Sequence, residues 1–286
     1  MNVKADNIKS GVTNILTIDI EDWYMDTDIS TWDSYEDRVV QSAQKILEIL
    51  DETNTKATFF VVGYVAEHFP ELIEDIKDGG HEMGTHGYSH TSIKKQTPAE
   101  FEEDLLKSVR ILEDITKEKI RGHRACEFSI VEETSWALDI LKKNGLKYDS
   151  SVFPVKTHLY GAQDAPLHPY HISSSNIKIG NPENDFLELP LSVYRIPIVH
   201  KNIPIAGGFY LRLFPYSFIK HAIRKINKMG QPVIFYIHPW EFDPKQPRIK
   251  ELKWYHYYRL GSTERKFKKL LKDFNFSLIM ETWGFK

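Results

Sequence analysis

The chain has 286 residues, of which 41% are hydrophobic and 27% are charged, and its formal net charge is −3. This composition is typical of a globular protein, and the length suits one large domain with a full hydrophobic core or two small domains. The small negative charge gives no reason to expect nucleic-acid or anionic-membrane binding. Cys126 is the single cysteine, which excludes an intrachain disulfide and agrees with a reducing compartment.

The N-terminal segment MNVKADNIKSGVTN lacks the apolar core of a signal peptide. No stretch of the sequence approaches the roughly 18 uncharged apolar residues of a membrane span. We therefore expect a cytoplasmic protein without a membrane span, and note that a chain trimmed of its leader would look the same.

Strand and helix patterns alternate along the chain. Runs of apolar, β-branched residues predict strands, whereas apolar residues at every third or fourth position predict helices. The predicted strands cover residues 13–20, 56–63, 80–86, 120–125, 146–151, 186–196, 207–213, 232–238 and 276–280. The predicted helices cover residues 36–52, 64–78, 97–117, 132–144, 216–229 and 263–273. Such alternation predicts an α/β fold with a parallel sheet, either wound flat or closed as a barrel.

Turn and cap residues mark several boundaries in this pattern. Pro70 is expected to begin or bend a helix, and Thr97-Pro-Ala-Glu100 has the pattern of a capping box with proline at the first helical position. Residues 152–185 are rich in proline, histidine and polar residues, and predict a long irregular excursion. With no visible linker, we interpret residues 1–286 as a single catalytic domain that contains this excursion.

Polar residues stand at or just after the ends of five predicted strands. These residues are Asp19, His86, Arg124, Asp149 and His238. In α/β barrels and open sheets, sites lie at the carboxyl ends of the strands. We therefore expect the five side chains to converge at one opening, formed by the carboxyl ends of the strands, which we call the mouth.

The segment MGTHGYSH contains His86 and His90, four positions apart. Neutral imidazole is the commonest metal ligand, and residues at i and i+4 share a face if the segment is helical. A catalytic zinc site takes about three protein ligands and keeps an open position. The alternative interpretation is a polar loop that happens to hold two histidines, since a bare HxxxH pattern is a weak signal.

Three carboxylates follow one another at the end of the first strand, at Asp19, Glu21 and Asp22. Buried acids need partners or a metal, and Asp19 and Glu21 point to the same side if the strand continues. Asp22 reaches the same mouth if the strand ends at Ile20. The alternative is an acidic cluster that caps a loop.

Arg124, His238 and Asp149 each allow two interpretations. Arg124, with Arg121 as a rival, could clamp a carboxylate and hold it ionised, or form a structural ion pair. His238 could act as a general acid or be a hydrogen-bonded core residue. Asp149 could orient His238 or be a turn residue. Cys126 is a nucleophile only if a base adjoins it, and otherwise a small buried residue.

Five segments in order resemble the motifs of the polysaccharide deacetylases, carbohydrate esterase family 4, over residues 13–240. These segments are LTIDIED, GHEMGTHGYSH, GHRACEFS, YDSS and IFYIHP. GGFYLRLFPY and RLGSTERKF further resemble a branch associated with extracellular polysaccharide biosynthesis. The resemblance implies a distorted (β/α) barrel, usually seven-stranded, and agrees with the alternation of strands and helices.

The resemblance also implies roles for individual residues. Asp19 would match the general base, Arg124 the residue that holds the base, Asp149 an orienting residue and His238 the general acid. His86 and His90 would match two metal ligands, and the third would be Glu21 or Asp22, since this sequence lacks the family's adjacent Asp-Asp. Cys126 and Glu127 replace the proline and its neighbour of the third motif, which is a departure from the family pattern. We also expect Trp23 and Tyr88 to contact substrate.

The chemistry implied by the resemblance is hydrolysis of an N-acetyl group on an amino sugar, which gives acetate and a free amine. The expected cofactor is a divalent metal, Zn²⁺ first, with Co²⁺ or Ni²⁺ as alternatives. Two other functions stay open at this point. One is a different amide hydrolase on the same barrel, such as an allantoinase-like enzyme or a deformylase. The other is a glycan-binding protein without catalysis, and the sequence leaves the acceptor open among polymer, lipid-linked and nucleotide-linked sugars.

Overall fold

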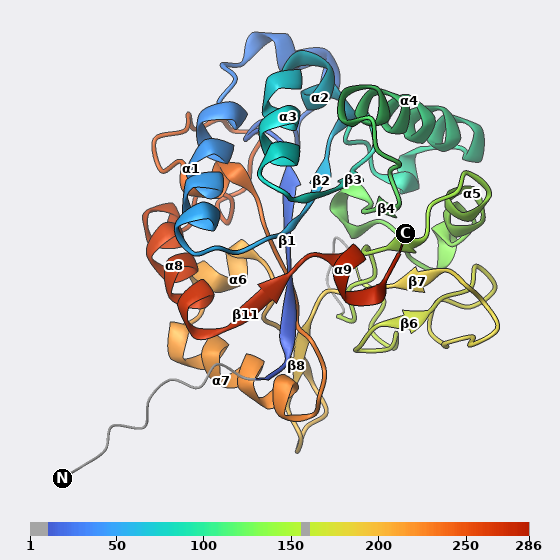
Figure 1. Ribbon diagram of the computed structural model, residues 1–286, viewed down its shortest axis with the longest axis vertical. Helices are drawn as coiled ribbons and strands as arrows, with labels where there is room; N and C mark the ends of the chain where they lie inside the picture. Colours follow the sequence, from blue (N-terminus) through green and yellow to red (C-terminus); the bar gives the residue numbers. More distant parts are fainter. Residues whose placement is uncertain (1–10, 156–160, 286) are drawn as a thin grey trace.

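A computed structural model describes residues 11–155 and 161–285 of the chain. Figure 1 shows a curved sheet at the centre of the molecule with most of the helices packed around its outside. The expectation of an absent leader concerns residues 1–10, and part of the predicted excursion concerns residues 156–160. Both segments lie outside the described residues.

The central sheet is formed by strands that run parallel to one another, in the order β10-β1-β2-β3-β4-β5-β7. These strands are β1 (Thr13–Ile20), β2 (Thr58–Val61), β3 (Glu82–Thr85), β4 (Gly122–His123), β5 (Tyr148–Asp149), β7 (Leu187–Glu188) and β10 (Ile234–Ile237). Two short strands extend the sheet: β6 (Tyr170–His171) is antiparallel to β7, and β11 (Asn275–Ser277) pairs with the start of β1. The seven parallel strands agree with the predicted barrel.

No strand pairing closes the sheet between β7 and β10 in the described residues. Ser192, which follows β7, bridges this gap instead. Its Oγ accepts a hydrogen bond from the Ile234 amide at 2.8 Å, and its own amide donates to the Ile234 carbonyl at 3.4 Å. The barrel is therefore distorted, as the sequence resemblance implies, because one serine replaces a ladder of hydrogen bonds.

The helices cover the sheet in the positions that the periodicity predicts, except for α6 and α9, which were not predicted. The helices are α1 (Val39–Glu52), α2 (Gly63–His68), α3 (Pro70–Asp78), α4 (Pro98–Thr116), α5 (Ala137–Lys143), α6 (Gly208–Leu213), α7 (Tyr216–Lys228), α8 (Thr263–Asp273) and α9 (Ile279–Trp283). The predicted helix over residues 64–78 divides at Pro70, and α4 begins with the expected Thr97–Glu100 capping box. Among the described residues, no helix is both long and apolar enough to cross a membrane.

The structure corrects three strand predictions. The predicted strand 186–196 divides into β7 in the barrel and β8 (Val193–Arg195) in a separate sheet. Residues 207–213 form α6 rather than a strand, because Gly208, Leu211 and Arg212 are buried at helical spacing. Only the start of the predicted strand 276–280 is a strand, since α9 begins at Ile279. A further two-stranded sheet, β8 (Val193–Arg195) and β9 (Asn202–Pro204), forms a hairpin outside the barrel.

Asn14 is a buried polar residue that joins three segments at the beginning of the barrel. Its Oδ1 accepts hydrogen bonds from the Val233 amide at 2.8 Å and from Asn227 Nδ2 at 2.7 Å. Its Nδ2 donates to the carbonyl of Asn275 at 3.3 Å. This amide therefore satisfies backbone groups that the parallel ladders leave open.

We predict that Asn14→Ala lowers the free energy of unfolding by about 2–4 kcal/mol, because buried donors lose their acceptor. Thr13→Ala is the matched control, since Thr13 is the exposed neighbour on β1 and its loss is expected to change stability by less than about 0.5 kcal/mol. Denaturant unfolding of both variants measures the difference. Equal midpoints for the two variants would refute this role of Asn14.

Candidate active site

The carboxylate of Asp19, at the carboxyl end of β1, is paired with Arg124. Arg124 Nη1 donates to Asp19 Oδ1 at 2.6 Å, and both side chains are buried. The guanidinium is fixed in turn by the carbonyl and hydroxyl of Ser150 at 2.8 and 2.7 Å and by Thr17 Oγ1 at 2.7 Å. Arg124 follows β4 and crosses to β1, so that a buried guanidinium pairs with the carboxylate of Asp19.

Glu21 lies two residues after Asp19, and its carboxylate is contacted by histidines on one side and by Trp240 on the other. Its Oε2 is 2.6 Å from His90 Nε2 and 3.7 Å from His86 Nε2. Its Oε1 accepts a hydrogen bond from Trp240 Nε1 at 2.9 Å. Burial opposes ionisation, but the positive charges of nearby histidines hold the pKa of Glu21 well below its usual value.

Asp22 has a different environment, although it is only one residue away. Its Oδ2 accepts hydrogen bonds from the amides of Arg38 and Val39 at 2.6 and 2.9 Å, and its Oδ1 accepts from the Trp23 amide at 2.7 Å. Asp22 therefore binds the otherwise unpaired amides at the start of α1. Burial raises the pKa of Asp22 to about 6, against the effect of these hydrogen bonds.

His86 and His90 meet through a loop and not through a helix, so the helical geometry considered for this pair is wrong. β3 ends at Thr85, and the chain then turns with positive φ at Gly87 (72°) and at His90 (49°). Glycine adopts this conformation readily, whereas a histidine there is uncommon and is held by its surroundings. The turn directs both rings toward Glu21, with ring centroids 5.1 Å apart.

Both imidazoles are oriented by backbone carbonyls. His86 Nδ1 lies 2.7 Å from the carbonyl of Arg124, and His90 Nδ1 lies 3.0 Å from that of Met25. A carbonyl only accepts, so each Nδ1 carries the proton and each Nε2 is available on the side of Glu21. Burial is the main cause that lowers the pKa of His86 to about 4, which makes this imidazole neutral at pH 7. The pKa of His90 is raised instead, because the nearby Cys126 and Glu21 outweigh the effect of burial, so this imidazole must release a proton before it binds a metal. Two oriented imidazoles beside a carboxylate fit a divalent metal.

Cys126 offers a second possible ligand set. Its Sγ and one nitrogen of each histidine, His86 and His90, all lie within 4.8 Å of one another. However, the thiol donates to the carbonyl of His86 at 3.2 Å, and burial raises its pKa, so the thiolate that metals bind is disfavoured. We therefore favour Glu21 over Cys126 as the third ligand. The alternative of a small buried residue describes Cys126 better than a nucleophile does.

His238 follows β10 and faces the two acids at the end of β1. Its Nε2 is 3.9 Å from Asp19 Oδ2 and 3.7 Å from Glu21 Oε1, and its ring stacks on Trp240 with centroids 4.9 Å apart. Its Nδ1 lies 2.9 Å from Glu241 Oε1. The carboxylate of Glu241 thus fixes the ring so that Nε2 points into the site.

Glu241 and Arg212 form a fully buried ion pair that sequence reasoning missed. Arg212 Nε and Nη2 contact Glu241 Oε2 at 3.0 and 2.9 Å, while Oε1 remains for His238. A Cβ on Gly208 would come within 2.0 Å of this carboxylate, so α6 must begin with glycine there. The sequence signal was available, as Glu241 stands three residues after His238, in the same spacing as a capping box.

The structure corrects the expectation that Asp149 orients His238. Asp149 Oδ1 is 2.6 Å from His123 Nδ1, and it also accepts from the Ser151 hydroxyl at 2.8 Å. Asp149 is buried beneath the site and positions the serine segment on which Arg124 rests. Asp149 therefore lies behind Arg124 and not beside His238.

Trp23 and Tyr88 are not placed as substrate-contacting residues would be. Trp23 is only 1% exposed, and its indole nitrogen donates to the Glu36 carbonyl, so the expectation of substrate contact is wrong for this residue. Tyr88 is half-buried, donates its hydroxyl to Glu67 at 2.6 Å and lies beneath Lys107. It is thus engaged with α2 and α4, and its contact with substrate stays a prediction.

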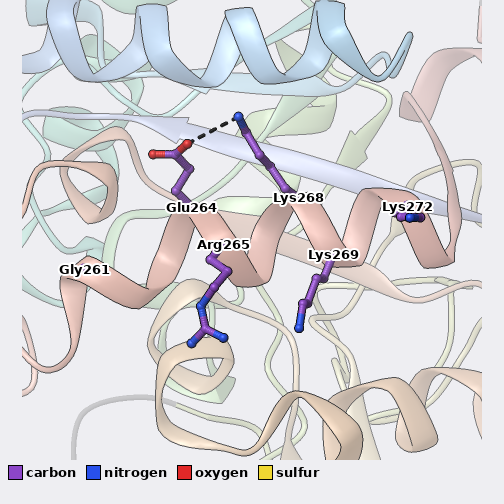
Figure 2. Close-up of a pocket in the computed structure, with 6 residues that line it drawn as sticks. All are labelled: Gly261, Glu264, Arg265, Lys268, Lys269 and Lys272. Carbon is purple, nitrogen blue, oxygen red and sulfur yellow. Dashed lines mark ion pairs between the residues drawn. The ribbon is translucent and has the colours of Figure 1, made fainter.

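A shallow concave surface elsewhere on the molecule is unrelated to these residues. Figure 2 shows that it runs along α8 and is lined by Gly261, Glu264, Arg265, Lys268, Lys269 and Lys272. None of the predicted site residues lines it. The chemistry therefore has to be assigned from the converging side chains and not from this surface.

Comparison with known proteins divides the chain into two matched regions. Residues 27–149 match the polysaccharide deacetylase family, and residues 150–284 match a domain of unknown function, DUF3473. A peptidoglycan deacetylase of Helicobacter pylori is 36% identical over 110 residues, which cover 38% of this chain and 36% of the relative. A peptidoglycan-N-acetylglucosamine deacetylase of Bacillus cereus is 30% identical over 121 residues, which cover 37% and 43%. The chain thus spans less than half the length of these curated relatives.

Solved structures support the same fold. A presumed polysaccharide deacetylase from Mycobacterium smegmatis has a TM-score of 0.60 and 19% identity, over 98% of this chain and 93% of that one. A peptidoglycan N-acetylglucosamine deacetylase crystallised with a small-molecule ligand has a TM-score of 0.50 and 18% identity, over 96% and 89%. The chain thus contains a region that matches the polysaccharide deacetylase family, at residues 27–149, and continues into a region that matches DUF3473.

Proposed function

We propose that this protein is a metal-dependent N-deacetylase that releases acetate from an N-acetylglucosamine-type residue of a glycan. The observation that carries the proposal is the convergence of two independent groups at one mouth. Asp19, held by Arg124, faces His238, held by Glu241, and Glu21 with two oriented histidines lies beside them. Relatives named for peptidoglycan and chitooligosaccharide deacetylation support the substrate class.

Glu21, His86 and His90 are the residues that would hold the metal, since Asp22 is committed to backbone amides. A divalent metal, Zn²⁺ first and Co²⁺ or Ni²⁺ as alternatives, would polarise the acetamide carbonyl and lower the pKa of a water molecule. Trp240 also binds Glu21, through an indole N–H that cannot itself ligate a metal. The carboxylate is thereby fixed before any metal arrives, as a ligand set requires.

Asp19 is placed to act as the general base. Its Oδ1 is occupied by Arg124, which leaves Oδ2 free toward the mouth and toward His238. Arg124 fixes the carboxylate, so that Oδ2 of Asp19 is placed to take the proton of an attacking water molecule. A base fixed by a buried arginine also loses little freedom when the reaction occurs.

His238 is placed to act as the general acid that protonates the departing amine. Burial by itself lowers the pKa of this imidazole, but the charges of Glu21, Glu241 and Asp19 raise it to about 9. The ring is then protonated at neutral pH with Nε2 turned toward the mouth. Protonation by His238 yields a free amino sugar and leaves acetate as the second product.

The region of unknown function has a part in this proposal. His238, Trp240, Glu241 and Arg212 all lie in the DUF3473 match, whereas the base and the three ligands lie within or before the deacetylase match. We infer that the two regions form one active site. The resemblance to an extracellular-polysaccharide branch makes a polymeric or oligomeric glycan the substrate that we favour.

The function is tested by incubating metal-loaded protein with N-acetylglucosamine and its short β-linked oligomers and measuring released acetate and free amine. We expect acetate from the oligomers, loss of activity after chelation and recovery on adding Zn²⁺ or Co²⁺. Release of formate instead would indicate a different amide hydrolase. Glycan binding without turnover by the metal-loaded protein would indicate a binding protein and would overturn the proposal.

The choice of third ligand gives a paired prediction. Glu21→Gln should remove bound metal and reduce activity by at least about 100-fold, while stability changes little. Asp22→Asn should keep the metal but lower the free energy of unfolding by about 1–3 kcal/mol, because its amide group cannot accept from all three backbone donors. Metal analysis and denaturant unfolding of both variants check this. The reverse pattern would make Asp22 the ligand.

Glu241 gives a prediction about pH. Since Glu241 raises the pKa of His238, Glu241→Gln should lower that pKa. A general acid is lost as pH rises through its pKa, so the alkaline limb of the kcat profile should move to lower pH. We also expect kcat to fall by about 100-fold with KM and metal content unchanged. Glu251→Gln, at an exposed residue, is the control. If the pH profiles of kcat for Glu241→Gln and Glu251→Gln superimpose, Glu241 does not set the pKa of His238.

A further inference from the structure

The charges of this chain are distributed unevenly in a way that the net value conceals. Between Glu188 and Glu241 the sequence contains no Asp or Glu. The same stretch contains seven basic residues: Arg195, Lys201, Arg212, Lys220, Arg224, Lys225 and Lys228. Only Arg212 of these belongs to the site described above, so the others need a separate explanation.

The β8–β9 hairpin carries two adjacent apolar side chains at its tip. Ile198 is 90% exposed and Val199 is 63% exposed. Both are placed between Arg195 at the end of β8 and Lys201 before β9, which are exposed too. Scattered single apolar residues are normal on a surface, but a projecting apolar pair between cations is typical of an interaction site.

Helix α7 lies beside this hairpin and presents a basic stripe. Tyr194 of β8 packs against Phe218 and His221 of α7, with ring centroids 6.1 Å apart in each contact. Arg224, Lys225 and Lys228 are exposed on the helix, while its apolar face is buried in the core. Met229, at the end of the helix, is 62% exposed and adds a third apolar group.

Helix α8 continues the basic surface from α7. Lys220 of α7 and Lys269 and Lys272 of α8 line a shallow groove between the two helices. Two acids lie on this surface, and both are paired: Asp273 with Lys220 at 2.8 Å and Glu264 with Lys268 at 3.3 Å. Figure 2 shows Arg265 and Lys269 extending away from α8 without an ion pair drawn to them.

The hairpin and the end of α7 lie at the end of the barrel opposite to the catalytic mouth. Asn227, near the end of α7, is hydrogen bonded to Asn14 at the beginning of β1, whereas Asp19 stands at the end of that strand. Figure 1 shows α7 and the hairpin at the end where β1 starts. Contact with a partner on this surface therefore leaves the catalytic mouth open to the aqueous phase.

We propose that the β8–β9 hairpin tip, α7 and α8 form a docking surface for an anionic phospholipid bilayer. Entry of an apolar tip into the headgroup region lowers the free energy, and so does the attraction of the surrounding cations to anionic lipid. A hydrated polyanion would satisfy the cations but would give the exposed Ile198–Val199 pair no apolar environment. The bilayer explains both features, and this inference is independent of the reaction that the protein catalyses.

The test is co-sedimentation of the whole protein with vesicles of phosphatidylcholine alone or with added phosphatidylglycerol. We expect binding only to the vesicles with phosphatidylglycerol, and weaker binding at high salt. Removal of a cation near the surface should weaken binding about five-fold. Arg224→Gln/Lys225→Gln/Lys228→Gln should therefore weaken it about 100-fold, and Ile198→Asp/Val199→Asp should also abolish most of it.

Two matched controls separate this surface from general effects. Lys95→Gln/Arg110→Gln/Lys117→Gln removes three exposed cations elsewhere, and Ile179→Asp changes an apolar residue that is 63% exposed, like Val199. Both should bind vesicles like the unchanged protein, and every variant should keep its thermal midpoint. Equal binding to both vesicle types, no binding at low salt, or hairpin variants that bind normally would overturn the proposal. Displacement by a soluble anionic polysaccharide, without dependence on the hairpin tip, would identify a polyanion site instead.

Discussion

Three carboxylates stand within four residues at the buried end of β1, and the rest of the site is arranged around the need to compensate them. A buried charge without a partner is strongly unfavourable, so each acid has its own solution. Asp19 is neutralised by Arg124, Glu21 by histidines and the Trp240 indole, and Asp22 by three backbone amides. Only the first two face the histidines of the mouth, and this difference separates the proposed base and ligand from a structural cap.

The two matched regions of the chain contribute different parts of this arrangement. The first half provides the carboxylates, the two histidines and Arg124 from the ends of neighbouring parallel strands. The DUF3473 region returns β10 to the other edge of β1 and so brings His238 opposite Asp19. Behind His238, the Arg212–Glu241 pair links α6 to the segment after β10. Because the position of His238 depends on this buried ion pair, the DUF3473 region has a physical reason to accompany the region that matches the polysaccharide deacetylases.

Sequence patterns were sufficient to predict the strands and helices of the barrel, because buried parallel strands are continuous apolar runs that end in polar residues. They also placed Asp19, His86, Arg124 and His238 at one mouth. They could not separate Glu21 from Asp22, since that choice depends on where the start of α1 lies in space. They misassigned Asp149, whose partner His123 is 26 residues away along the chain, and missed Glu241, which is meaningful only with Arg212. Net charge likewise concealed the basic surface, because acids elsewhere in the chain offset it.

The proposed function depends most on one divalent metal being shared by Glu21, His86 and His90. In that arrangement Asp22 keeps its hydrogen bonds to the backbone amides at the start of α1. The most direct measurement is a crystal structure of the protein grown with Zn²⁺, with the metal located by anomalous scattering at the zinc edge. We predict a peak bound by Nε2 of His86, Nε2 of His90 and a carboxylate oxygen of Glu21, at about 2.0–2.2 Å from each. A peak bound by Asp22 or by the sulfur of Cys126 in place of Glu21 would contradict the account.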